Sequence, residues 1–248
     1  MLITSLENDK VKKWKQLKDK KYRDTYNEFL VEGEHLVIEA YRSGLLEEII
    51  LEQDSVTVLD VPIVYVSKEI IKTISTLDTP SYIMGVCKKK SENLDYGNKL
   101  LLLDRVQDPG NLGTIIRSSK AFGVDTIILG DGTADIYNPK VIRATQGNQF
   151  HINIISRNLI ELIQELKEKE IPVYGTRVEY GEDIRTLSAR DKEKYALIMG
   201  NEGSGVDRDI LDLCDKYIYI ELESEVESLN VAIASSILLY EMSRNYDK

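Results

Sequence analysis

The chain has 248 residues and a formal net charge of −10, which argues against a general nucleic-acid binder, while 42% hydrophobic and 30% charged residues are typical of a globular protein with a buried core. Its cysteines, Cys87 and Cys214, are too few for a disulfide framework or a cysteine-based zinc site, which favours a reducing, cytoplasmic setting. The first residues lack the apolar stretch of a signal peptide, and no apolar run approaches the ~18 residues that a membrane span needs, so we expect no membrane contact.

Basic residues gather near the N-terminus, although the chain as a whole is acidic. Residues 10–23, KVKKWKQLKDKKYR, hold eight Lys or Arg and one Asp. Such a run predicts either the solvated face of a helix or a local patch that contacts phosphate groups. In the second case the contacts would come from Lys12, Lys13, Lys20, Lys21 and Arg23. Trp14 and Tyr22 lie among these charges and either stack on bases or pack the helix onto its domain.

Residues 1–90 have the pattern of a small unit of mixed strands and helices. A strand is expected at 29–33 (FLVEG), followed by a helix that ends at Gly44. Further strands are expected at 48–52 and 62–67, and a helix at 67–75 precedes the apolar run PSYIMGVC. Residues 91–99 are polar and form the expected linker to a second domain, which is expected over 100–248.

From residue 100 onwards, short apolar runs alternate with helical segments. The runs are LLLLD (100–104), DTIILG (125–130), IPVYGT (171–176), YALIMG (195–200) and YIYIEL (217–222), and QFHINII (149–155) is a further predicted strand. Strands that alternate with helices indicate an α/β fold with a parallel sheet covered on both faces. Ligands of such sheets bind outside the carboxyl ends of the strands, so the segments that follow each strand are the candidate site.

Familiar cofactor and catalytic patterns are missing from these segments. No G-x-x-x-x-G-K-[ST] sequence occurs, and GNEGSG (200–205) has a different spacing from the dinucleotide fingerprint. Its glycines predict either a simple turn or a close approach of the backbone to a ligand. His35 and His151 have no evident partners, so metal or Ser-His chemistry has little support and no metal is expected.

The segment DRVQDPGNLGTIIRSSKAFG (104–123) predicts a turn that opens a helix. Asn111 could cap this helix. Arg117 lies one turn after Gly113, so its guanidinium can lean back over bare backbone toward the rim of the sheet. An arginine in that position suits a phosphate or a carboxylate, and a surface salt bridge is the alternative.

The last segment, SLNVAIASSILLYE (228–241), is apolar almost all round, which indicates a helix buried against another subunit or in an intramolecular groove. Ser228 could cap this helix or direct its hydroxyl group into a site.

Three segments now resemble a known family in the expected order. DRVQDPGNLGTIIRSSKAFG, IMGNEGSGV and SLNVAIASSILLYE resemble motifs 1, 2 and 3 of the SpoU (TrmH-like) class of SPOUT RNA methyltransferases, and FLVEGEHLVIEA resembles the start of that family's L30e-like substrate-binding domain. The resemblance implies a C-terminal trefoil knot, a homodimer and bent S-adenosylmethionine as cofactor. It also implies methylation of a ribose 2′-hydroxyl in RNA, rRNA more readily than tRNA.

The resemblance also assigns residues to roles. Arg117, Asn111, Glu202, Ser228 and Asn230 match the catalytic positions, and Thr176, Gly200, Ile220 and Leu229 match the cofactor contacts. The hypothesis is that Arg117 binds the neighbouring phosphate and helps to activate the hydroxyl, and that in the dimer it reaches the cofactor of the other subunit. Glu202 would orient this arginine, while Asn111, Ser228 and Asn230 position the ribose.

One departure from the family pattern concerns motif 3. Glu221 replaces the usual proline, and Ser224 and Glu225 stand where glycine is usual, so the loop is more acidic and weaker cofactor binding is expected. Two alternatives remain open: a base-modifying SPOUT methyltransferase, and a non-catalytic RNA-binding or ribosome-assembly protein on the same fold.

Overall fold

A computed structural model describes residues 2–177, 181–223 and 225–244 of the chain. These form two compact units, Met1–Ser91 with Asp135–His151, and Glu92–Ala134 with Ile152–Lys248. The first unit thus contains a segment, residues 135–151, that the sequence grouped with the second. Ser224 lies outside the described residues, as do residues 178–180 of the segment that follows the third predicted strand of the second domain.

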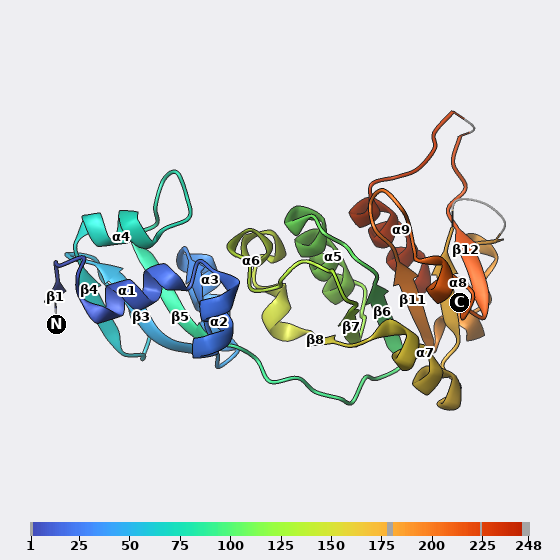
Figure 1. The fold of residues 1–248 in the computed structure, drawn as a ribbon, viewed down its shortest axis with the longest axis horizontal. Coiled ribbons are helices and arrows are strands. Elements are labelled where there is room, and N and C mark those ends of the chain that lie inside the picture. The colour runs from blue at the N-terminus through green and yellow to red at the C-terminus, as the bar shows by residue number, and fades with distance from the viewer. Residues whose placement is uncertain (1, 178–180, 224, 245–248) are drawn as a thin grey trace. The chain divides into compact units, whose positions relative to one another are not determined.

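The N-terminal unit is a mixed sheet with helices (Figure 1). Its elements are β1 (Leu2–Ile3), α1 (Asp9–Gln16), α2 (Lys20–Tyr26), β2 (Glu28–Glu32), α3 (Glu34–Arg42), β3 (Leu46–Glu52), β4 (Ile63–Val66), α4 (Lys68–Ile74), β5 (Ile83–Lys88), α6 (Pro139–Thr145) and the 3₁₀ turn η1 (Asn148–His151). The strand order is β1-β4-β3-β5-β2, and β5 runs antiparallel to both of its neighbours. The strands and helices expected between residues 29 and 87 are all present.

Helix α1 carries the basic N-terminal segment and is anchored by its apolar face. Asn8 caps the helix by accepting a hydrogen bond from the backbone N–H of Lys10 at 2.9 Å. Val11 and Trp14 are buried in the same core cluster as Ile50 and Ile70. Trp14 therefore packs the helix onto its domain and does not present its ring for base stacking.

The segment 135–151 completes the core of the N-terminal unit. The ring of Phe29 on β2 lies 4.8 Å from that of Tyr137 and 6.0 Å from that of Phe150, centre to centre. His151 was expected in a strand but lies in η1, where its Nε2 atom is 2.9 Å from a carboxylate oxygen of Glu39. The strand begins only at Asn153, because the chain first has to leave this turn.

Arg23 on α2 is buried and binds the segment 135–151 through an ion pair with Asp135. Its guanidinium donates to the backbone oxygens of Leu17 and Lys18 and to the carboxylate of Asp135 at 2.7 Å. The side chains of Arg23 and Asp135 are only 4% and 15% exposed. A buried ion pair has lost most of its hydration, so removing either partner leaves the other charge buried and unpaired.

We expect Arg23→Met to lower the free energy of unfolding of the full chain by about 3–5 kcal/mol, as measured by urea denaturation. The cause is the unpaired carboxylate of Asp135, so the double variant Arg23→Met/Asp135→Leu should recover most of the loss. A single variant as stable as the wild type would show that the ion pair does not hold the segment.

The C-terminal unit is a parallel sheet, as the sequence predicted. Its elements are β6 (Lys99–Leu103), α5 (Pro109–Ala121), β7 (Thr126–Leu129), β8 (Asn153–Ser156), α7 (Leu159–Glu168), β9 (Val173–Thr176), β10 (Glu182–Asp183), the 3₁₀ turns η2 (Ile184–Thr186) and η3 (Arg190–Lys192), β11 (Tyr195–Met199), α8 (Arg208–Leu211), β12 (Lys216–Tyr219) and α9 (Val231–Ser243). The strand order is β10-β12-β9-β11-β6-β7-β8, and every described pairing is parallel.

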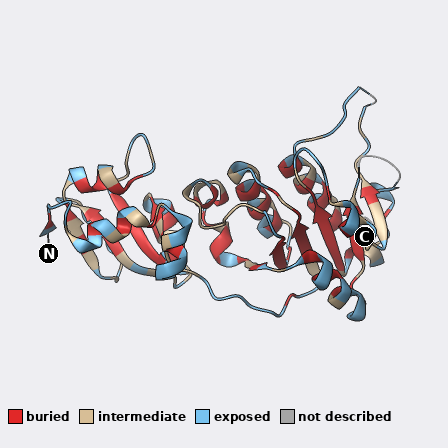
Figure 2. Cartoon of the chain, viewed as in Figure 1, coloured by how far each residue is buried: buried red, intermediate tan, exposed pale blue. Residues whose placement is uncertain are grey.

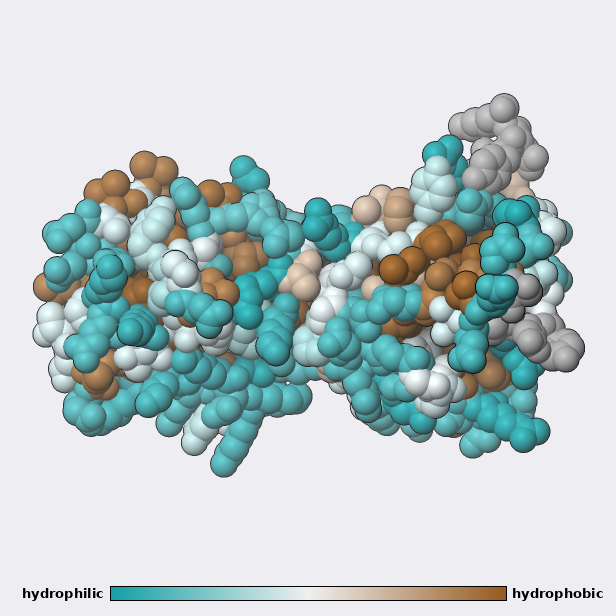
Figure 3. Space-filling view, turned by 90° about the horizontal axis from the view of Figure 1, so that it is seen from above, coloured by the Kyte–Doolittle hydropathy of each residue, from teal (hydrophilic) through white to brown (hydrophobic). Residues whose placement is uncertain are grey.

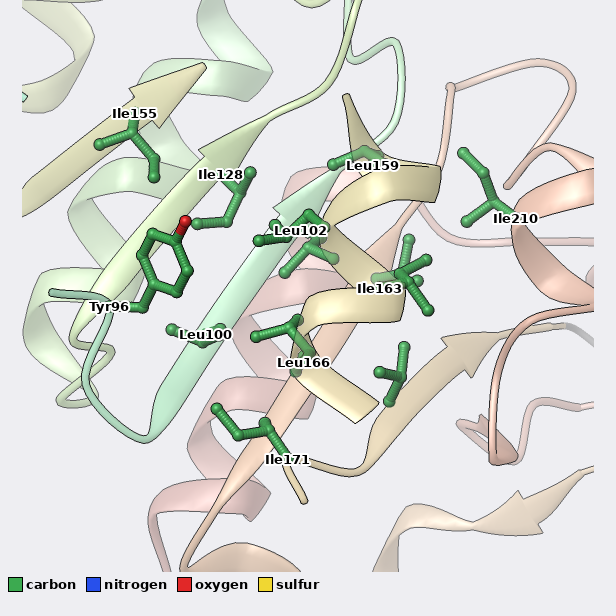
Figure 4. Packing of buried hydrophobic residues seen from close by; sticks show 14 of the residues in the cluster. Tyr96, Leu100, Leu102, Ile128, Ile155, Leu159, Ile163, Leu166, Ile171 and Ile210 are labelled. Atoms are coloured by element: carbon green, nitrogen blue, oxygen red, sulfur yellow. The ribbon is translucent and has the colours of Figure 1, made fainter. Parts of the chain in front are cut away.

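The central strands of this sheet, β6 and β11, are buried except for Lys99 at the start of β6 (Figure 2). Leu100 and Leu102 of β6 pack against Leu159, Ile163 and Leu166 of α7, and Figure 4 shows these side chains between helix and strand. Since successive side chains of a strand point to opposite faces, the other residues of β6 face away from α7. Figure 4 shows further helices behind the sheet, and α5 and α9 pack against each other. The trefoil knot that the resemblance implies stays a prediction.

Candidate functional site

Three segments far apart in the chain meet at the carboxyl ends of β6 and β11. The side-chain amide of Asn230 donates to the side-chain oxygen of Asn111 at 2.9 Å. The amide of Asn111 in turn donates to a carboxylate oxygen of Glu202 at 3.1 Å. Each of the three residues comes from a different sequence motif, so a continuous chain of hydrogen bonds joins the motifs in one protomer.

Helix starts explain why these two asparagines are placed as they are. Asp108 caps α5 by accepting from the backbone N–H of Asn111 at 2.8 Å, with Pro109 in the first turn. Asn111 was expected as the cap; because Asp108 takes that role, the side chain of Asn111 is free to face Glu202. Asn230, and not Ser228, caps α9 through its side-chain oxygen, which leaves its amide to bind Asn111.

Glu202 is held as a carboxylate. Partial burial favours its neutral form, but hydrogen bonds from Asn111 and from the backbone N–H groups of Asp108 and Gln107 outweigh burial and lower the pKa of Glu202. The backbone contacts are 3.2 and 3.4 Å long. Glu202 therefore binds the start of α5 and the side chain of Asn111 within the protomer, and its expected role of orienting Arg117 stays a prediction.

The loop that carries Glu202 is shaped by Asn201, a residue that the sequence analysis missed. Its side-chain oxygen accepts from the backbone N–H groups of Gly203 and Ser204 at 2.9 and 3.1 Å, and its amide donates to the backbone oxygen of Arg105 at 2.9 Å. The first two bonds form an Asx turn, for which an asparagine ahead of Glu-Gly-Ser-Gly was a usable signal. The third bond ties the loop to the end of β6.

Gly200 allows this loop to fold back on itself. A Cβ atom at this position would lie 2.1 Å from the backbone carbon of Gly205 and 2.1 Å from the backbone nitrogen of Val206, so no side chain fits. The loop also closes by backbone hydrogen bonds between Asn201 and Gly205, both 3.0 Å long. The glycine is thus required by close backbone approach within the loop.

Beside this loop lies a cavity of about 410 Å³, within the usual range of ~300–1,000 Å³ for small-molecule sites. The residues expected to contact the cofactor, together with Glu202 and Ser228, all line it: Thr176, Gly200, Ile220 and Leu229. Ile218 and Leu238 add apolar wall, while the 200–205 loop offers backbone groups. Apolar wall and accessible backbone suit the adenosine part of S-adenosylmethionine, so the donor set fits the cofactor.

Arg117 does not join this chain of contacts within one protomer. It is exposed on α5 and makes no hydrogen bond or ion pair with any described residue. Its neighbour Ser118 is 2.7 Å from Ser236 of α9, oxygen to oxygen. Arg117 is therefore a free cation on a helix that packs beside α9.

The basic residues proposed for RNA contact lie in the N-terminal unit and differ in availability. Lys12, Lys13 and Lys20 pair with Glu7, Glu28 and Asp24 at 2.9, 2.8 and 2.8 Å. Lys21 is exposed and lies 5.8 Å from the centre of the Tyr22 ring. Arg23 corrects the expectation: it is buried and its guanidinium binds Asp135, so it presents no charge for a phosphate.

One of the departures in motif 3, Glu221, has a partner in the structure. Glu221 forms an ion pair with Arg185, which also binds Asp183. An arginine therefore neutralises the carboxylate that replaces the family proline. Glu225 is exposed.

Other chemistry finds little support among the described residues. Burial raises the pKa of Cys214 to about 12 and that of Cys87 well above its ordinary value, so neither thiol ionises near neutral pH. In the described ranges, His, Cys, Asp and Glu side chains form no group that could hold a metal ion. Nor is any helix found there that is long and apolar enough to cross a membrane.

Comparisons with known proteins agree with this geometry. A family model described as "SpoU rRNA Methylase family" matches residues 98–240, and one described as "MRM3-like substrate binding domain" matches residues 8–85. The chain is 43% identical over 245 residues to 23S rRNA (guanosine(2553)-2′-O)-methyltransferase RlmP of Bacillus subtilis, covering 97% of this chain and 98% of the relative.

Solved structures are similar over almost the whole chain. The AdoMet-bound rRNA methyltransferase from Sinorhizobium meliloti is 31% identical with a TM-score of 0.86, covering 98% of this chain and 97% of that one. A TrmH-family protein from Porphyromonas gingivalis is also 31% identical with a TM-score of 0.86, covering 96% and 98% of the two chains. The expected combination of a substrate-binding domain with a parallel α/β domain is therefore confirmed.

Proposed function

Because the chain belongs to the SpoU rRNA methylase family, we propose that it transfers the methyl group of S-adenosylmethionine to the ribose 2′-hydroxyl of a 23S rRNA guanosine. One observation carries the proposal: the hydrogen-bonded chain Glu202–Asn111–Asn230 borders the cavity lined by Gly200, Ile220 and Leu229. The choice of guanosine follows from the similarity to the Bacillus subtilis guanosine 2′-O-methyltransferase.

Asn111, Asn230 and Glu202 would have different roles in the methyl transfer. When bound, S-adenosylmethionine supplies an electrophilic methyl group on its sulfonium. Asn111 and Asn230 hold each other in place and position the ribose against the cavity. Glu202 fixes Asn111 and stays ionised near neutral pH. Holding the hydroxyl in line with the methyl group supplies much of the rate, because alignment alone removes a large part of the barrier.

Arg117 would bind the phosphate next to the target ribose, and we place it in the site of a partner subunit. Its guanidinium does not serve as a general base, because arginine keeps its proton in proteins. A cation beside the hydroxyl instead stabilises the alkoxide that develops as the hydroxyl proton passes to water. Action in a partner's site is supported by one observation: Arg117 is exposed and makes no hydrogen bond or ion pair with any described residue of its own protomer.

A homodimer through α9 would provide that partner. Figure 3 shows hydrophobic residues at the surface where α9 lies. On α9, Ile233, Ile237 and Tyr240 remain 53%, 36% and 37% exposed. Their spacing puts them on one side of the helix. An exposed apolar stripe on a helix otherwise buried indicates a subunit interface, and α5 with Arg117 packs directly beside it.

We expect Ile233→Lys to convert a dimer into a monomer in light scattering, because the charge would have to be buried in the interface. Ile160→Lys is the matched control, since Ile160 is 39% exposed on α7 and should tolerate the change. A variant that stays dimeric would place the interface elsewhere.

The function itself is tested by mapping ribose methylation in 23S rRNA. Deleting the gene should remove one 2′-O-methyl group, seen as restored alkaline cleavage of the adjacent linkage. The purified protein with S-adenosylmethionine should put it back on unmodified rRNA. An unchanged methylation map, or a methyl group found on a base, would overturn the proposal.

A further inference from the structure

Arg177 is a charged residue of the cavity to which no role has been given. It directly follows Thr176 at the carboxyl end of β9, and its backbone N–H donates to the backbone oxygen of Ile218 at 3.1 Å. Its guanidinium lies 4.8 Å from the centre of the Tyr217 ring. The backbone hydrogen bond fixes the position of the Arg177 main chain. The contact with the Tyr217 ring orients the planar guanidinium.

The charges in the described lining of the cavity are few. They are the carboxylate of Glu202 and the guanidinium of Arg177. Glu202 is already occupied by Asn111 and by backbone N–H groups. Arg177 is exposed and forms no ion pair with any described residue. Arg177 is thus the one cation among the described lining residues, and its guanidinium makes no hydrogen bond with any described residue.

We propose that Arg177 binds the α-carboxylate of S-adenosylmethionine, an inference that rests on the proposed function. The cofactor carries one carboxylate, which loses water when it enters a partly enclosed cavity and then needs a charged partner. A planar guanidinium pairs with a carboxylate through two parallel hydrogen bonds, and stacking on Tyr217 orients it beforehand. The carboxylate would also avoid Glu202, which has the same charge.

The test compares two ligands on the full-length protein by titration calorimetry: S-adenosylmethionine, and its decarboxylated analogue, which keeps the sulfonium and the amine. Arg177→Gln should weaken the binding of S-adenosylmethionine about 10- to 100-fold, which is the range for loss of a hydrogen bond to a charged group. The analogue should bind wild type and variant equally. Arg177→Lys should restore only part of the affinity, because lysine keeps the positive charge but lacks the two parallel N–H donors of the guanidinium.

Arg190→Gln is the matched control, since Arg190 is also exposed in the same unit but lies outside this cavity. Equal weakening of both ligands by Arg177→Gln would overturn the inference in favour of a general effect on the loop. If Arg177→Gln leaves the cofactor affinity unchanged but raises the KM for rRNA, Arg177 contacts an RNA phosphate and the inference is wrong. If the wild type binds neither ligand, the proposed function itself is wrong; the other two outcomes do not affect the proposed function.

Discussion

Arg117→Ala is expected to reduce methyl transfer by roughly 10²- to 10³-fold, the range for loss of one electrostatic stabiliser, while leaving the affinity for S-adenosylmethionine nearly unchanged. The affinity should hold because Arg117 is not among the residues that line the cavity and makes no hydrogen bond or ion pair with any described residue of its own chain. The rate should fall because the phosphate and the developing alkoxide both lose their cation. Single-turnover kinetics with saturating cofactor, together with calorimetry, separate the two effects.

Lys120→Ala is the matched control for Arg117, since Lys120 is an exposed cation one turn further along α5. It should methylate at nearly the wild-type rate. If Arg117→Ala does so as well, Arg117 has no catalytic role and the assignment is wrong.

Gly200→Ala is expected to weaken the binding of S-adenosylmethionine by about 10²-fold or more. A methyl group there would meet the backbone of Gly205 and Val206 at 2.1 Å, and backbone cannot rotate away as a side chain can. The loop would have to open, which moves both the cavity wall and Glu202. Calorimetry with S-adenosylmethionine measures the effect.

Gly203→Ala gives the comparison within the same loop. A Cβ atom there would meet only the side-chain oxygen of Asn201, at 3.6 Å, which is an ordinary contact. Its effect should be far smaller than that of Gly200→Ala. Similar losses for both variants would mean that the loop tolerates no added methyl group anywhere, and that the close approach at Gly200 is not the cause.

These two variants together test whether the site is shared between subunits. In a mixed dimer, the Arg117→Ala subunit keeps an intact cavity and the Gly200→Ala subunit keeps the arginine. If Arg117 acts across the interface, mixing two inactive proteins restores part of the activity. If it acts within its own chain, the mixture stays inactive.

Much of the fold was predictable because the strands of the C-terminal sheet are buried on both faces. Runs such as LLLL at residues 100–103 and YALIM at 195–199 are continuous and apolar for that reason. Helix caps were harder, because several capping residues stand close together. Asp108 and Asn111 both qualify at the start of α5, as do Ser228 and Asn230 at the start of α9, and propensity does not choose between them.

Contacts between residues far apart in the sequence could not be predicted from local sequence patterns. The burial of Arg23 depends on Asp135, and the chain Glu202–Asn111–Asn230 joins residues about 90 and 120 positions apart. Their roles were proposed from a family resemblance, and no spacing rule would have brought the three side chains together. Asn201 had a local turn signature, whereas its bond to the backbone of Arg105 required the fold.

The segment 135–151 makes the N-terminal compact unit discontinuous in sequence, although it lies within residues 98–240, which match one family model. The polypeptide passes between the two units after residues 91, 134 and 151. A fragment that stops at residue 91 would lack the carboxylate that neutralises Arg23 and the aromatic rings that cover Phe29. Grafting this module onto another methyltransferase, or expressing it by itself, would therefore require splicing in the later piece as well.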